Sequence, residues 1–469
     1  MERKRLLVIT AAVIIIIALI ALVAFSFVLQ SQNRGVETVT SNPRKSEYVT
    51  EFPTQNNETA PNGVAIDSHG SVWFTLQNES ALAKLEPNNG TITEYHIPLA
   101  KNTGTTTWGI AVDNSRDLVW FTELVSNSLW SFNMTDHKFA QYQLKTPASF
   151  PYGIAIDRNG DVWFTEILGN KIGEITANGT LSEFNIPLPG GYLEPSGITI
   201  DNSSRVWFTL AGIDEVGSYF HGQFQFYNLT GLIVTPVSIA VDSRGNLWLT
   251  QHGPSFISEF NPRTGYFETI STSIPPPPLN ASLPYFDYVD PSGNVWFNEH
   301  YGNSIAMYNP STRTLTEYRI PTRFAYVGDI SGMLTMNLSP LNSDPWFTEY
   351  FSGNVGTVNA SLPPKISVGI QNNSGLFGSP LRVPNGTSAS ITVLVNDSGQ
   401  NQVVFAAAVG NFSGTSRLAF AFSNASSTLP YQSTLTITNK GSKAGAYFVT
   451  ITAEASNLAV SRVIEVVVP

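Results

Sequence analysis

Short hydrophobic segments recur along the chain at lengths that fit strands rather than helices. One unit has the form G-[IV]-A-[IV]-D, a short turn and then [VL]-W-F-T. Its apolar runs are brief, rich in β-branched and aromatic residues, and bounded by Gly, Asp, Asn and Pro, which is typical of strands joined by tight turns. Each unit therefore predicts a small antiparallel sheet.

The unit occurs seven times. Its tryptophans lie 41 to 50 residues apart, at positions 73, 120, 163, 207, 248, 296 and 346. Repeats of that size, built from short strands, are typical of the four-stranded blades of a β-propeller. In one unit the predicted strands are residues 152–157, 161–166, 171–175 and 181–186. The repeats together predict a seven-bladed β-propeller.

The last unit lacks an outer strand, because Pro363 and Pro364 follow soon after the strand expected near 354–358. A segment with the pattern of an outer strand, residues 46–53, precedes the first unit instead. We expect it to complete the last blade, so that the ring has no free edge, and we place the propeller at 46–360. Residues 365–469 contain further short strand-like runs and predict an Ig-like β-sandwich.

The N-terminus has a different pattern. Residues 6–29 form an apolar run whose only polar members are Thr10 and Ser26. At about 1.5 Å per residue it is long enough to cross a hydrocarbon core of about 30 Å. Because basic residues precede it, we expect a cytoplasmic tail at 1–5, a single transmembrane anchor at 6–29, a linker at 30–45 and an extracytoplasmic remainder. The alternative is a cleaved signal peptide, whose apolar region is usually shorter.

Composition narrows the functional classes. The 469 residues carry 25 Lys and Arg against 35 Asp and Glu, a net charge of −10, and no cysteine. The lack of a basic run argues against a nucleic-acid partner. The missing cysteines exclude disulfides, a thiol nucleophile and Cys-ligated metals. Fifteen Asn-x-Ser/Thr triplets predict an exported glycoprotein surface, and the alternative is a Ser/Thr/Asn-rich surface without glycans.

The W-F-T repeat, followed by a Lys171-Ile172-Gly173 type of third strand, resembles the virginiamycin B lyase family of streptogramin lyases. The resemblance implies a propeller with an active site at one end of its channel. There, a magnesium ion held partly by acidic side chains and a histidine base would promote elimination in a cyclic depsipeptide lactone. The family places that histidine at the start of an inner strand. None of the matching positions here is histidine: they are Asn62, Trp108, Tyr152, Ser196, Val237, Tyr285 and Val327.

Candidate chemistry gathers just after the W-F-T strands. Their ends should share one rim with the starts of the inner strands, because neighbouring strands run antiparallel. The carboxylates and imidazoles there predict a divalent cation such as Mg²⁺, held by Glu166, Glu299 and Glu349, with His252 or His300 as catalytic base. Glutamates at this rim can equally serve as structural hydrogen-bond acceptors. The predicted ligand-binding residues are Glu123, Trp108, Tyr152, Tyr285 and Tyr350.

Three functions remain open at this point, and one of them is a purely structural part of the cell envelope, which the sequons would also suit. The first is a membrane-anchored extracytoplasmic propeller that binds a small molecule, a glycan or a protein at its channel mouth. The alternative is a divalent-metal-dependent lyase or hydrolase related to the streptogramin lyases. The alternative requires the glutamates and one histidine to lie within about 3 Å of a common point.

Overall fold

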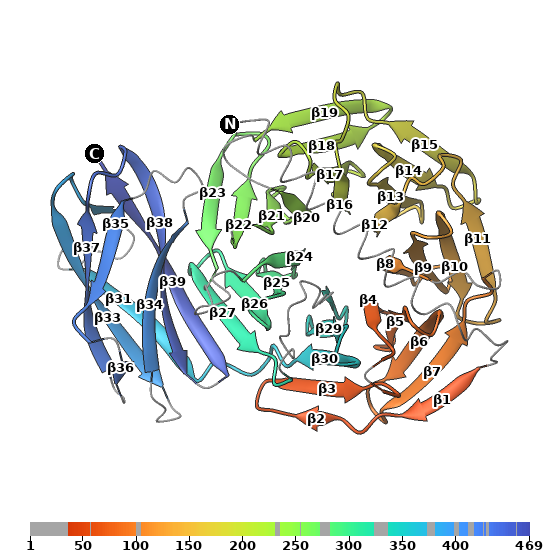
Figure 1. Cartoon of the computed structure of the whole chain (residues 1–469), viewed down its shortest axis with the longest axis horizontal. Coiled ribbons are helices and arrows are strands. Elements are labelled where there is room, and N and C mark those ends of the chain that lie inside the picture. Colours follow the sequence, from red (N-terminus) through yellow and green to blue (C-terminus); the bar gives the residue numbers. More distant parts are fainter. Residues whose placement is uncertain are drawn as a thin grey trace.

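The computed structural model is all-β and propeller-like (Figure 1). It describes residues 36–469 except 57, 100–104, 230–234, 254, 273–281, 323–335, 373–379, 398–402, 411–416, 425, 428–430 and 456. Within this part of the chain every regular element is a strand, and no helix could span a membrane. The predicted tail and the predicted anchor at 6–29 lie outside the described residues.

Four-stranded antiparallel sheets follow one another around the ring, and in each the first strand lies nearest the centre (Figure 1). The first sheet holds β4 (Pro61–Ile66), β5 (Val72–Leu76), β6 (Ala81–Glu86) and β7 (Thr91–His96). The second holds β8 (Thr107–Asp113), β9 (Leu118–Glu123), β10 (Ser128–Asn133) and β11 (Phe139–Gln143). The third holds β12 (Pro151–Ile156), β13 (Val162–Glu166), β14 (Lys171–Ile175) and β15 (Leu181–Asn185).

The same order continues through three more units. They are β16 (Pro195–Ile200), β17 (Val206–Leu210), β18 (Glu215–Phe220) and β19 (Gln223–Asn228); β20 (Pro236–Val241), β21 (Leu247–Gln251), β22 (Phe256–Phe260) and β23 (Phe267–Ser271); and β24 (Pro284–Val289), β25 (Val295–Glu299), β26 (Ser304–Asn309) and β27 (Thr314–Arg319). Every residue of each second strand from β13 to β25 is buried, because neighbouring sheets cover both of its faces.

The sheet at the end of the ring combines both ends of the propeller sequence. It holds β28 (Met336–Leu338), β29 (Pro345–Glu349) and β30 (Asn354–Val358), followed by β3 (Val49–Pro53) and β2 (Arg44–Lys45). β3 runs antiparallel to β30, with Val49 opposite Val358. The expected pairing of the N-terminal segment with the last unit is therefore present. A further strand, β1 (Glu37–Thr40), pairs with β7 on the outside of the first sheet.

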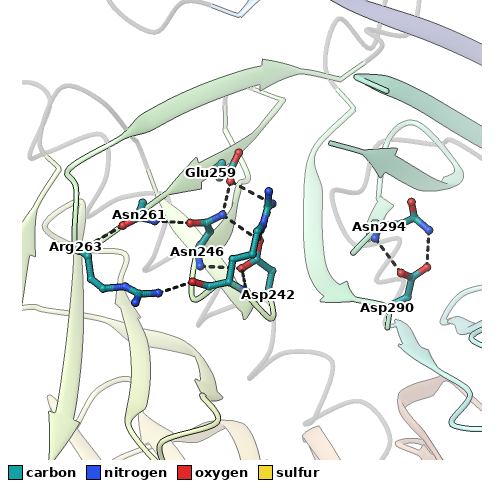
Figure 2. A network of polar contacts seen from close by, with 8 residues as sticks. Asp242, Asn246, Glu259, Asn261, Arg263, Asp290 and Asn294 are labelled. Atoms are coloured by element: carbon teal, nitrogen blue, oxygen red, sulfur yellow. Dashed lines mark hydrogen bonds and ion pairs between the residues drawn. The ribbon is translucent and has the colours of Figure 1, made fainter. Parts of the chain in front are cut away.

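The turn after the inner strand explains why aspartate and tryptophan occur together in the repeat. Asp290 accepts hydrogen bonds from the backbone N–H groups of Ser292 and Asn294 with one oxygen. Its other oxygen accepts the Asn294 amide (Figure 2) and, at 3.1 Å, the Trp296 indole. One carboxylate thus closes the turn and satisfies a buried donor, for which an unmade bond is costly. The indole bond recurs between Asp67 and Trp73 and between Asp201 and Trp207.

Two repeats depart from this pattern because an arginine follows the aspartate. Arg116 takes the second oxygen of Asp113, and Arg244 takes that of Asp242. Figure 2 shows the denser network that results around Asp242, which also binds Asn246. In both repeats the tryptophan indole N–H is buried without a hydrogen-bond partner among the described residues (Trp120 and Trp248).

A double-mutant cycle on Asp290→Ala and Trp296→Phe tests the hydrogen bond between the aspartate and the tryptophan. We expect the two substitutions to be coupled by about 1 kcal/mol in the free energy of unfolding, because each removes one partner of the same buried hydrogen bond. The measurement is urea unfolding of the parent, both single variants and the double variant. The matched cycle on Asp113 and Trp120, where the bond is missing, should show coupling near zero. Equal coupling in both cycles would contradict the interpretation.

The C-terminal region forms two further layers of strands. One sheet holds β31 (Ile366–Asn372), β33 (Ser388–Asp397), β37 (Tyr431–Asn439) and β35 (Leu418–Phe422). The other holds β39 (Leu458–Val468), β38 (Gly445–Ala455), β34 (Val403–Gly410) and the short strands β36 (Ser426–Ser427) and β32 (Leu381–Arg382). β39 pairs antiparallel with β27, so this second sheet continues directly from a sheet of the ring (Figure 1).

The hydrophobic core also continues from the ring into the C-terminal region. Trp296 and Tyr318 of the ring belong to the same buried cluster as Val449, Ile451 and Val460 of the C-terminal sheets. The pairing of β39 covers the edge of β27, which would otherwise expose unpaired backbone groups. We conclude that the two parts stabilise each other.

A substitution in the C-terminal region should therefore destabilise the ring. Val460 is 2 % exposed, and an aspartate there would bury a charge without a partner, at a cost of about 3 kcal/mol or more. All nine tryptophans lie outside residues 365–469, so tryptophan fluorescence reports on the ring alone. We expect Val460→Asp to lower the temperature at which this fluorescence changes.

The control is Val404→Asp, at an exposed position of the same region. It should leave the fluorescence transition in place. A ring transition unaffected by Val460→Asp would show that the two parts unfold independently.

Candidate functional site

At the start of the inner strands, the pairing with the second strand is irregular, and this irregularity sets the direction of the next side chain. The ladder between first and second strands shifts register just after the opening residue, for example between Pro151 and Ile154. In several repeats the preceding residue is left-handed, as Phe150 and Leu283 are. Its carbonyl accepts the N–H of the fourth residue after the tryptophan, which in one repeat is His300 (3.1 Å). A bulge of this kind re-aims a side chain.

The re-aimed side chains meet across the ring. Tyr152 begins the third sheet and Tyr285 the sixth, yet their hydroxyl groups are hydrogen-bonded to each other. The Trp108 ring stacks on Tyr152 with centroids 4.9 Å apart and lies 6.4 Å from Tyr285. We call the end of the ring where these residues lie the mouth. The turns between second and third strands lie at this end.

Both predicted histidines join this group. The His300 ring stacks on Tyr285 at 4.7 Å, and the His252 ring lies 5.1 Å from Tyr285 and 5.5 Å from His300. We call Trp108, Tyr152, Tyr285, His252 and His300 the mouth cluster. Trp108, Tyr152 and His300 are 6 %, 7 % and 8 % exposed, so the cluster is packed rather than spread over the surface.

Two groups of the mouth cluster are uncharged at physiological pH. Burial lowers the pKa of His252 to about 4, so its imidazole is uncharged. Burial also raises the pKa of the Tyr285 phenol, which keeps its proton. A neutral histidine can accept or donate one hydrogen bond, but it has little basicity left for proton abstraction.

Several buried polar atoms at the mouth have no hydrogen-bond partner among the described residues. Among them are the Trp108 indole nitrogen, the His252 Nε2 atom and the Asn62 side-chain oxygen. The Asn62 amide nitrogen donates to the Thr107 carbonyl at 2.6 Å, which fixes the orientation of that side chain. Buried polar atoms usually find a partner in the protein or in a bound molecule. The mouth therefore offers a donor, an acceptor and one atom that can be either.

Tyr350 lies at the same end but outside the mouth cluster. Its hydroxyl donates to the Gln77 side-chain oxygen at 3.0 Å, and the Gln77 amide donates to the Thr107 carbonyl, also at 3.0 Å. Since Asn62 binds the same carbonyl, Tyr350 is connected to the cluster by a chain of polar contacts. The structure thus brings Trp108, Tyr152 and Tyr285 into direct contact and places Tyr350 at their rim.

The predicted glutamates have a different environment. Glu123 accepts the backbone N–H groups of Thr106, Val125 and Ser126, so it holds the mouth turn of its own sheet. Glu349 accepts the Ser352 hydroxyl and the Asn354 amide, again within one sheet. In both cases the glutamate is a structural hydrogen-bond acceptor, which is the alternative role expected for glutamates after W-F-T.

The structure does not bring the three predicted metal ligands together. Glu166, Glu299 and Glu349 belong to β13, β25 and β29, in three separate sheets. Burial raises the pKa of Glu166 to about 7 and that of Glu349 to about 8, and it raises the pKa of Glu299, which faces Glu317 and Arg319. Among the described residues these three carboxyl groups do not form a set whose ligand atoms all lie within 4.8 Å of one another, so the trio does not fit one shared ion.

Three other metal-capable side chains do converge. The ligand atoms of Glu37, Glu94 and His96 lie within 4.8 Å of one another, between β1 and β7 on the outside of the ring. Among the described residues this is the one such group of three or more. The sequence pattern did not indicate it, because Glu37 comes from a strand that the repeat does not contain.

Asp287 is a buried acid that sequence reasoning missed. It occupies the position held by Val64, Ile110 or Ile154 in other repeats, opposite the phenylalanine of W-F-T. Neither of its carboxyl oxygens has a hydrogen-bond partner among the described residues, and burial raises its pKa to about 8. Alignment of the seven repeats with one another would have revealed the exchange of an apolar residue for an acid.

Asp287 should make stability depend on pH. Its ordinary pKa is 3.8 and its folded pKa about 8. Between these values only the folded state holds the proton, so stability falls by about 1.4 kcal/mol per pH unit as pH rises. We expect Asp287→Asn to remove that loss, so that it gains stability over the parent between pH 5 and pH 7. Urea unfolding at both pH values measures the gain.

The control is Glu58→Gln, which removes an exposed carboxylate. Its stability relative to the parent should be the same at both pH values. An Asp287→Asn variant that also kept a constant difference from the parent would contradict a raised pKa.

Comparisons with known proteins include a match to one family model. Residues 47–331 match the model of the virginiamycin B lyase family. The fold is similar to a streptogramin B lyase structure, with TM-score 0.58 and 26 % identity over 66 % of this chain and 97 % of that one. It is similarly close to a catalytically inactive virginiamycin B lyase from Staphylococcus aureus with quinupristin (TM-score 0.57, 25 % identity, 66 % and 98 % covered).

One curated sequence is also similar, over a short stretch. Virginiamycin B lyase from Bacillus licheniformis is 46 % identical over 44 residues. That stretch is 9 % of this chain and 15 % of that protein. The similarity therefore covers about one repeat of this chain and does not extend to the rest of that protein.

Proposed function

This chain belongs to the virginiamycin B lyase family, and from that premise we propose that it is a binding protein that holds an uncharged ligand at the mouth of its ring. The observation that carries the proposal is the convergence of the mouth cluster from five strands or strand ends. An aromatic group with a few unpaired polar atoms is typical of ligand sites. Since His252 and Tyr285 are uncharged, an ion would lose its hydration beside them without gaining a partner.

We propose the finer features of the architecture along with this function. The ring would have seven blades, one for each W-F-T segment, and residues 365–469 would form an Ig-like sandwich. Residues 6–29 would anchor the chain in the cell membrane as a single span, with residues 1–5 in the cytoplasm. The bulk of the chain would be extracytoplasmic and glycosylated at its sequons.

A metal-dependent lyase or hydrolase is the second candidate. The family and the proximity of His252 to His300, 5.5 Å between ring centroids, favour it. The dispersed glutamates and the low pKa of His252 count against it, since elimination requires a base that titrates near the working pH. A divalent cation is better matched by Glu37, Glu94 and His96, which lie on the outside of the ring and not in the mouth cluster.

Binding to the mouth cluster is tested with three probes that share one ring and differ in charge: indole-3-acetamide, indole-3-acetate and tryptamine. We expect the neutral amide to bind at least ten-fold more tightly than either charged probe, because burying an unpaired charge costs several kcal/mol. Saturation-transfer NMR and calorimetric titration measure the affinities. Trp108→Ala should weaken amide binding about ten-fold or more, as expected for an aromatic residue at the centre of a site.

Tyr266→Ala is the control, since Tyr266 is exposed in the turn between β22 and β23 at the other end of the ring. It should leave amide binding unchanged. Equal affinity for the three probes would contradict a neutral site. Ring opening of quinupristin by the chain, followed by liquid chromatography and abolished by His252→Ala, would support the lyase instead.

A further inference from the structure

We propose that Glu37, Glu94 and His96 bind one divalent cation of the type that accepts both nitrogen and oxygen ligands, such as Zn²⁺, and that this ion fastens the N-terminal strand β1 to the first sheet of the ring. None of the three residues belongs to the mouth cluster, so this site does not depend on ligand binding there. Three features support it: the orientation of the imidazole, the spacing of the ligand atoms, and the position of β1 where the ring closes.

The His96 imidazole has one nitrogen toward a backbone carbonyl and the other toward a carboxylate. Its Nδ1 atom lies 3.3 Å from the Glu79 carbonyl oxygen, and its Nε2 atom lies 3.9 Å from the Glu37 carboxylate. A carbonyl oxygen can only accept a hydrogen bond, so Nδ1 carries the proton and Nε2 of the neutral ring presents its lone pair. Metal-binding histidines are typically held in this way, with the second ring nitrogen donating to a carbonyl or a carboxylate.

The separation of the His96 Nε2 atom from the Glu37 carboxylate suits two ligands of one ion. Nε2 is buried and has no hydrogen-bond partner among the described residues. At 3.9 Å the carboxylate is too far away to form a hydrogen bond with it. An ion such as Zn²⁺ holds each ligand at about 2 Å, so two of its ligands lie up to about 4 Å apart. A cation between these two atoms would therefore contact both.

The two glutamates lie directly opposite each other on neighbouring strands. Glu37 of β1 pairs with Glu94 of β7, and like charges at such positions destabilise a sheet. The ligand atoms of all three residues lie within 4.8 Å of one another, so ligation requires them to approach by less than about 1 Å. A divalent cation balances the charge of two carboxylates. The imidazole beside them favours an ion that accepts nitrogen over Mg²⁺ or Ca²⁺.

The site lies where the two ends of the propeller sequence meet. The N-terminal segment contributes β1 to the first sheet and β2 and β3 to the last sheet, so it joins both from the outside (Figure 1). Val39 of β1 packs against a hydrophobic cluster that contains Ile92 of the first sheet and Phe52 of the last. β1 has four residues and is the edge strand of its sheet. A metal bond from Glu37 would add a fixed point to this short strand.

Calorimetric titration of the full-length chain with Zn²⁺ tests the site. We expect one equivalent to bind, and His96→Ala to weaken binding about ten-fold or more, because one of three ligands is lost. Glu37→Gln should also weaken it, because an amide oxygen carries no charge. Mg²⁺ should bind about ten-fold more weakly than Zn²⁺ or less tightly still, because it prefers oxygen ligands alone.

The matched control is His69→Ala, since His69 is exposed in the turn between β4 and β5 of the same sheet. It should leave the affinity for Zn²⁺ unchanged. A chain that does not bind Zn²⁺ would overturn the proposal, because His96 and Glu37 would then meet as an ion pair without a metal. Equal affinity in the parent and in His96→Ala would also overturn it, because the ion would be bound elsewhere.

Amide hydrogen exchange tests whether the ion fastens β1. We expect Zn²⁺ to slow exchange in residues 37–40 about ten-fold or more, because opening of β1 would then require the loss of a metal ligand. His96→Ala should abolish this effect. The edge strand β35 of the C-terminal region should exchange at the same rate with and without Zn²⁺. Zn²⁺ binding that depends on His96 but leaves exchange in β1 unchanged would contradict the role in fastening the strand.

Discussion

Burial of the second strand of every sheet on both faces is the constraint on which this structure depends. In β13, β17, β21 and β25 no residue reaches the surface, so each sheet needs a neighbour on either side. A row of such sheets must either close on itself or leave a large apolar face in water. The pairing of β3 with β30 joins the two ends of the row. The repeated aspartate is related to the same constraint, because in three repeats it accepts the indole N–H of a tryptophan that is buried on both sides.

The same physics accounts for the C-terminal region. The outer strand β27 would leave an open edge and an apolar surface, and β39 covers both. The polar link between Arg319 and Glu454 spans this junction at 3.1 Å. Glu299, which the sequence pattern suggested as a metal ligand, lies near Arg319 and contributes to this charged region rather than to the mouth. A carboxyl group such as that of Glu299 can serve in catalysis. In this buried strand it contributes to packing instead.

The mouth differs from the rest of the ring because the repeat is least regular there. Bulges at the starts of the inner strands release one side chain per sheet from the repeating pattern. Trp108, Tyr152 and Tyr285 occupy these positions and meet at the centre. None of the residues at the corresponding positions of this chain is a histidine. Family membership therefore accounts for the scaffold, and the side chains at the bulges account for what the scaffold can bind.

The sequence alone determined the repeat, the strand positions, the pairing of residues 46–53 with the last unit and the family, because strand periodicity and turn chemistry are local properties. It also identified the aromatic residues and both histidines of the mouth cluster. Only the tertiary structure decided which side chains meet. Glu166, Glu299 and Glu349 share one sequence position with Glu123 but point into separate sheets, whereas Glu37 joins Glu94 and His96 from outside the repeat. The direction of a side chain depends on bulges and on neighbouring sheets. Pairing between strands that are far apart in the sequence depends on closure of the ring. Neither is encoded within any single repeat.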